Sequence, residues 1–145
     1  MAANVTHQEL FPLSNNNDSI QWRKIECDEN LISSSQFEGE RILNVDTKAL
    51  EILSKEAFHC IAHFFRSSHL QQLQDILEDS ESSANDRFVA LDLLRNSQIA
   101  AEGVLPMCQD TGTAIVIGKK GRCVWTDGSD QDFISRGIES TYRTD

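Results

Sequence analysis

The chain has 145 residues, of which 39% are hydrophobic and 25% are charged, the proportions of an ordinary soluble globular domain with a core of its own. Its formal net charge of −10 argues against a nucleic-acid-binding protein, because contact with phosphates needs clustered lysine and arginine. No apolar run approaches the roughly 20 residues that span a bilayer, so we expect no membrane partner. Residues 1–9 lack a secretion signal and an arginine-rich presequence. We therefore expect a cytoplasmic protein and leave a mitochondrial location open.

The first predicted helix follows a polar, irregular segment. Residues 1–30 have the composition of a loop, with a short strand expected over residues 20–25. Helical periodicity begins after Asp46, whose side chain suits the N-cap position, and continues to about Ser67.

Two further helices are expected before the apolar pattern changes. Ser68 is predicted to cap a second, shorter helix. Ser83 or Asn85 is predicted to cap a third helix, which ends at Gly103. The positions expected to face the core from this third helix are apolar: Phe88, Leu91, Leu94 and Ile99.

The pattern turns to strand at residue 104. Residues 113–118 are β-branched and apolar, and residues 123–126 form a second such run after a glycine-containing turn, so a β-hairpin is predicted. A last helix is expected from Asp130. The basic residues of the turn are interpreted as an exposed hairpin tip, with attraction of a dianionic substrate as the alternative: Lys119, Lys120 and Arg122. The predicted fold class is α+β, with amphipathic helices packed on the beginning of a sheet.

Most potential metal ligands lack the spacing that metals require. His59 and His63 stand at positions i and i+4 of the first predicted helix, but Cys60 occupies the place where the zinc motif HExxH needs glutamate. We therefore interpret both histidines as structural. The cysteines are far apart in the sequence, which argues against a disulfide framework and against zinc: Cys27, Cys60, Cys108 and Cys123.

Polar side chains with ligand chemistry are concentrated directly before the predicted hairpin. Cys108 supplies a thiolate, which suits a soft metal. The amide, carboxylate and hydroxyl groups of Gln109, Asp110 and Thr111 can hold and protonate an oxygen-rich ligand. A buried strand would need a partner for each of these polar groups. The chemistry alone leaves open a ligand-binding or catalytic role for Cys108 and a structural one.

The motif and its surroundings resemble the class I (iron–sulfur, 4Fe–4S) fumarate hydratases. The most specific part is residues 106–114, which read Pro-Met-Cys-Gln-Asp-Thr-Gly-Thr-Ala, and iron–sulfur tartrate dehydratases are the nearest confusable relatives. Matching segments also occur over residues 37–43, 85–91 and 94–101. Residues 1–30 are not usefully matched, so we expect them to be an extension.

The resemblance implies roles for three residues of the motif. Cys108 looks like one of three cysteines that hold a 4Fe–4S cluster, whose open iron acts as a Lewis acid on the substrate's oxygens. Gln109 and Asp110 match residues that contact a bound dicarboxylate, and Asp110 also assists the base that takes a proton from malate. The implied reaction is the reversible hydration of fumarate to (S)-malate. Cys123 falls at a position that is not a cluster ligand in the family.

The resemblance also implies that the chain is part of a larger protein. Residues 31–145 correspond to the N-terminal portion of the N-terminal domain in a two-domain enzyme that works as a homodimer. The other two cluster cysteines are then expected beyond Asp145, so this chain alone should be inactive and should not assemble a stable cluster. Two alternatives stay open: a related hydro-lyase acting on tartrate or mesaconate, and a truncated, non-catalytic isoform that acts as a binding module.

Overall fold

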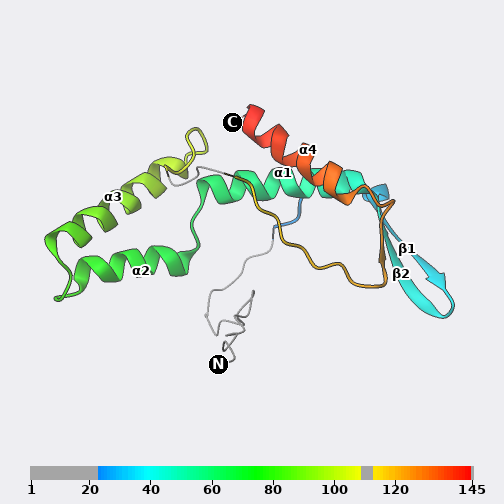
Figure 1. Ribbon diagram of the computed structural model, residues 1–145, viewed down its shortest axis with the longest axis horizontal. Coiled ribbons are helices and arrows are strands. Elements are labelled where there is room, and N and C mark those ends of the chain that lie inside the picture. Colours follow the sequence, from blue (N-terminus) through cyan, green and yellow to red (C-terminus); the bar gives the residue numbers. More distant parts are fainter. Residues whose placement is uncertain (1–22, 109–112, 145) are drawn as a thin grey trace, which may run out of the picture.

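The computed structural model describes residues 23–108 and 113–144, and these form an α+β fold, as predicted. In chain order the elements of this part of the chain are a 3-10 helix η1 (Glu29–Leu31), strands β1 (Ile32–Phe37) and β2 (Glu40–Val45), helices α1 (Thr47–His63), α2 (Ser67–Glu78) and α3 (Ala84–Ala100), strand β3 (Val124–Trp125) and helix α4 (Asp130–Thr144). Figure 1 shows that α1 connects a β-ribbon at one end of the elongated molecule to the α2–α3 pair at the other.

A β-hairpin that the sequence analysis did not predict opens the sheet. Strands β1 and β2 pair antiparallel up to Phe37 and Glu40, which leaves a two-residue turn. Glu38 and Gly39 in this turn have φ angles of 48° and 82°, the left-handed backbone that tight hairpin turns require at both central positions. The predicted strand over residues 20–25 lies partly outside the described residues, and residues 23–25 are not in a strand.

The predicted hairpin of residues 113–118 and 123–126 is wrong. Residues 113–120 form no strand, and β3 pairs instead in parallel with β2, at Leu43↔Val124 and Asn44↔Trp125. The physical reason is that the apolar run of residues 113–118 has no buried face. Ile115 is 77% exposed and Ile117 is 60% exposed, so the β-branched run has nothing to pack against in the part of the chain that the structure describes.

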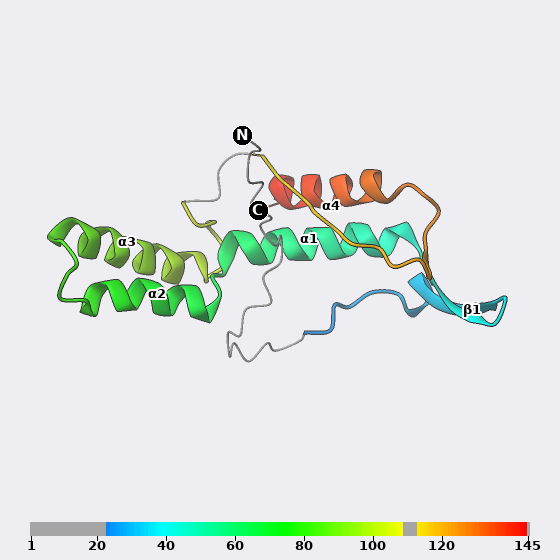
Figure 2. The same ribbon diagram turned by 60° about the horizontal axis from the view of Figure 1, so that its bottom comes forward.

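Helices α1 and α4 lie side by side and run in the same direction (Figure 2). The predicted N-cap of α1 is confirmed, because an oxygen of Asp46 accepts the N–H of Lys48 at 2.8 Å. The predicted last helix also begins at Asp130. Helix α1 ends at His63, before the predicted Ser67.

The α2–α3 pair forms the other end of the molecule. The predicted cap at Ser83 is confirmed: its hydroxyl accepts the Asp86 N–H at 3.1 Å, and the Asp86 carboxylate accepts the Ser83 N–H at 2.9 Å. The predicted cap at Ser68 is wrong. Helix α2 begins at Ser67, and Arg66 occupies the N-cap without a side-chain hydrogen bond.

The expected core face of α3 is wrong for most of its members. Phe88 is 63% exposed, Leu91 and Ile99 are also exposed, and only Leu94 is half-buried. The buried residues of α3 are the small Ala90 and Ala100. Among the described residues the buried apolar side chains are few and include three alanines, less than the core expected from the length of the chain. Within the described residues, no helix combines the length and the apolar character that crossing a bilayer requires.

Candidate functional site

The loop that carries Cys108 is held between the ends of α1 and α3. The chain leaves α3 at Ala100, and Gly103, at a φ of 74°, donates its N–H to the Ala100 carbonyl at 2.9 Å. Met107 then donates its N–H to the carbonyl of Ala62, in the last turn of α1, at 2.8 Å. The Met107 side chain is only 4% exposed, so it anchors the loop against the helices.

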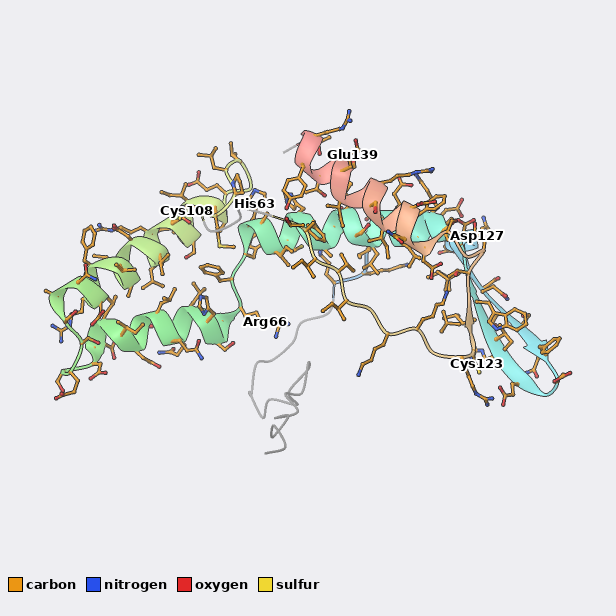
Figure 3. The ribbon with its side chains drawn as sticks, in the orientation of Figure 1. His63, Arg66, Cys108, Cys123, Asp127 and Glu139 are labelled. Atoms are coloured by element: carbon orange, nitrogen blue, oxygen red, sulfur yellow. The ribbon has the colours of Figure 1, made fainter. Side chains whose placement is uncertain are left out.

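Cys108 is the one predicted site residue that the structure places. Its N–H donates to the side-chain oxygen of Asn96, on α3, at 3.0 Å. Its thiol is free and exposed (Figure 3). Gln109 and Asp110 lie outside the described residues, so their roles stay predictions. Asn96 was within the matched residues 94–101, but the sequence analysis gave it no role.

The other cysteines do not join Cys108. Figure 3 shows Cys123 beside the β-ribbon, near the other end of α1 from Cys108. Its thiol donates to a Glu40 carboxylate oxygen at 3.3 Å. This hydrogen bond, then burial and the charge of Glu40, raise the pKa of the Cys123 thiol, which Arg122 opposes. The proton of the Cys123 thiol is therefore held more tightly than that of an ordinary cysteine.

Cys60 and Cys27 are also free thiols. Cys60 is half-buried on α1 and lies 3.8 Å from an Arg23 guanidinium nitrogen, whereas Cys27 is exposed. In the described ranges 23–108 and 113–144, no group of three or more Cys, His, Asp and Glu side chains is arranged to hold a metal ion. A metal centre at Cys108 would therefore receive one thiolate, that of Cys108, from the described residues.

The histidine pair of α1 has structural contacts, as interpreted from the sequence. His63 is 1% exposed, and its Nδ1 lies 2.9 Å from the carbonyl oxygen of His59. The two rings also pack against each other, with centroids 4.5 Å apart. The main chain thus engages Nδ1 of His63, whereas the buried Nε2 has no hydrogen-bond partner among the described residues.

Two of the three basic residues near the turn, Lys120 and Arg122, are paired with carboxylates. Lys120 contacts Asp130 at 2.7 Å and Thr126 at 2.8 Å, and Arg122 pairs with Glu40. The hydrogen bond from Lys120, followed by that from Thr126, lowers the pKa of Asp130. Local pairing of these cations leaves less positive field to attract a dianionic substrate.

A cavity of about 490 Å³ lies elsewhere, between the C-terminal end of α1 and the helices α2 and α3. Apolar side chains such as Phe65, Leu70 and Leu94 form much of its wall, together with His63. Cys108 is not among the residues that line it.

Comparisons with known proteins agree with the motif. Residues 52–145 match the family model described as Fumarate hydratase (Fumerase). The chain is 48% identical over 139 residues to the aerobic class I fumarate hydratase of Escherichia coli K12, an alignment that covers 96% of this chain and 25% of that protein. The anaerobic class I enzyme of the same organism is 46% identical, with the same two coverages. Fumarate hydratase 2 of Leishmania major is 44% identical over 132 residues, which are 91% of this chain and 23% of that protein.

These relatives define the class of protein, since fumarate hydratases are hydro-lyases. With its family model matched over residues 52–145, the chain belongs to the class I fumarate hydratase family, and the resemblance found in the sequence is confirmed. The matched range includes Cys108, Gln109 and Asp110. The chain spans about a quarter of the length of these relatives, and the 139 aligned residues include part of residues 1–30.

Proposed function

We propose that the complete protein that contains this chain catalyses the reversible hydration of fumarate to (S)-malate. The observation that carries the proposal is the family match, which runs through a motif whose cysteine is exposed on a loop fixed by two helices. We also propose that residues 31–145 belong to the N-terminal domain of a larger homodimer in the cytoplasm. Exposed apolar side chains on α1 and α3, such as Ile61 and Phe88, support further protein surface against these helices.

The chemistry of Cys108 fits a cluster ligand. Thiolate is the ligand that iron–sulfur clusters use, and this thiol is exposed while its main chain is anchored. Two further thiolates would come from residues outside this chain, because Cys123 donates a hydrogen bond to Glu40 at a distant place in the fold and the described residues hold no group of three metal-ligating side chains. When bound, a 4Fe–4S cluster with one open iron supplies a Lewis acid for the oxygens of the substrate.

The two residues after Cys108 would act on the dicarboxylate itself. The Gln109 amide can donate to a carboxylate oxygen of fumarate or malate, which orients the substrate. The Asp110 carboxylate would orient or assist the base that removes a proton from the methylene carbon of malate in the dehydration direction. In the hydration direction water supplies the proton for that carbon and the hydroxide for its neighbour, and in the dehydration direction both leave as water, so the reaction needs no oxidant or reductant.

The complete protein, reconstituted without oxygen, tests the proposal through Cys108→Ser. We expect loss of iron content, of cluster absorbance and of fumarate hydration together, because serine is a poor ligand for iron in such a cluster. Cys123→Ser is the matched control and should retain all three. A Cys108→Ser protein that kept its iron and activity would contradict the assignment. Parallel assays with fumarate, mesaconate and tartrate identify the substrate, and faster turnover of either of the last two would overturn the fumarate proposal.

A further inference from the structure

Asn96 occupies a position that helix formation does not explain. It lies within α3, before the last turn, and asparagine is a poorer helix former than alanine because its side chain competes for main-chain hydrogen bonds. It caps neither end of α3, whose N-cap is Ser83 and whose C-cap is Ala101. The half-buried side chain instead accepts the N–H of Cys108 at 3.0 Å. Its presence is explained by this contact.

Two successive N–H groups of the loop are thereby bound to two different helices. Met107 donates to the Ala62 carbonyl, one of the last carbonyls of α1, which have no partner within the helix. Cys108 donates to Asn96 on α3. The peptide groups before and after Met107 are therefore fixed, which fixes the place of the Cα atom of Cys108, from which the exposed thiol extends.

We infer that Asn96 is a positioning residue for the Cys108 thiolate, an inference that rests on the proposed cluster site. A metal ligand must be held close to its productive geometry by neighbours that do not touch the metal. Without the Asn96 oxygen, the Cys108 peptide group can rotate, and the thiolate leaves the iron more often. The cluster should therefore lose iron faster, although the ligand itself is unchanged.

The experiment measures iron release to a ferrous chelator from the anaerobically reconstituted complete protein. We expect Asn96→Ala to release iron about fivefold faster than the wild type, the factor typical of one lost hydrogen bond. Asn96→Asp keeps an acceptor oxygen at the same place and should release iron within about twofold of the wild type. Gln98→Ala is the matched control, since Gln98 is an exposed amide on the same helix, and it should equal the wild type.

The thermal stability of the cluster-free protein separates positioning from folding. Alanine improves helix propensity while it removes one hydrogen bond, two effects of similar size and opposite sign, so Asn96→Ala should melt close to the wild type. If Asn96→Ala does not fold, Asn96→Gln, which displaces the acceptor by one methylene group, should show the faster iron release instead.

The possible outcomes are distinct. A wild-type protein that holds iron, with Asn96→Ala equal to it, would overturn the role of Asn96 and leave the proposed function intact. Equally fast release from Asn96→Ala, Asn96→Asp and Gln98→Ala would also overturn it, because the effect would then belong to the helix. A wild-type protein that binds no iron would overturn the cluster proposal together with this inference.

Discussion

The close contact between α1 and α4 predicts that Gly137→Ala will loosen α4. A methyl group added at Gly137 would lie closer than 3.0 Å to the Ser54 hydroxyl oxygen and to the main-chain oxygen of Glu51. The Glu51 oxygen belongs to the backbone of α1 and cannot turn away. The helices must therefore separate, which also weakens the hydrogen bonds of Ser54 to Ile134 and of Thr141 to Lys55, now 3.1 and 3.0 Å long.

These effects give the size of the change. Overpacking of this kind costs about 2 kcal/mol, and two weakened hydrogen bonds cost about 1 kcal/mol each. Replacing glycine by alanine inside a helix returns about 1 kcal/mol. The net destabilisation of α4 is then about 3 kcal/mol, which corresponds to roughly 100-fold faster local opening.

Amide hydrogen exchange of α4, followed by mass spectrometry on the complete protein, measures this opening. Gly118→Ala is the control, because a methyl group at Gly118 meets no atom of the described residues within 4 Å. We expect α4 amides to exchange roughly 100-fold faster in Gly137→Ala and at the wild-type rate in Gly118→Ala. Equal exchange in the two variants would refute the reasoning, since the helices would then have room for the methyl group.

Two further predictions concern single carboxylates. Asp110→Asn in the complete protein should leave the cluster absorbance intact and slow fumarate hydration by about 100-fold, as expected for a lost proton-transfer aid. Steady-state kinetics measure this change. An unchanged kcat would show that Asp110 takes no part in the chemistry. The pKa of Asp86 lies below its ordinary value of 3.8 because of hydrogen bonds from the Ser83 side chain and N–H. The stabilisation of α3 by the Asp86 carboxylate is therefore complete above pH 3.8, and it is lost as the pH falls through the pKa that Asp86 has in the folded protein. Ser83→Ala should bring the pKa of Asp86 back toward 3.8 in an NMR titration of the carboxyl group, and a pKa that does not move would contradict the capping geometry.

Local interactions account for the parts of the fold that the sequence predicted. The caps at Asp46 and Ser83 use hydrogen bonds to residues two or three positions away, so residue type and spacing are sufficient to identify them. The β1–β2 hairpin was missed because β1 reads Ile-Ser-Ser-Ser-Gln-Phe, without alternating apolar residues, and its six residues are all exposed. Its turn is Glu-Gly and not the usual Asn-Gly or Asp-Gly pair.

Long-range contacts account for the parts that were missed. Strand β3 was assigned to the wrong partner because its pairing with Leu43 of β2 joins residues some eighty positions apart, a relation that no periodicity shows. The candidate site likewise has one part that the sequence showed and one part that it did not. The polar run beginning at Cys108 and its resemblance to the family were visible in the sequence, whereas the contact of Asn96 with the Cys108 main chain leaves no pattern of side chains.

Exposed apolar residues flank Cys108 in the sequence on both sides of its anchored main chain. Val104 and Leu105 precede it and are 71% and 61% exposed, and Ile115 and Ile117 follow it at 77% and 60%. Exposed apolar groups in such number are typical of a surface that other protein covers. Covering them would exclude water from the proposed cluster, and solvent access is one of the features that sets the reactivity of iron–sulfur centres. The ends of α1 and α3 fix where the main chain of Cys108 lies, while the apolar residues on either side depend on further protein for burial. The loop is formed because its hydrogen bonds to α1 and α3 lie within the described residues. The strand predicted to follow it is not formed there, because its apolar side chains have no surface to cover them.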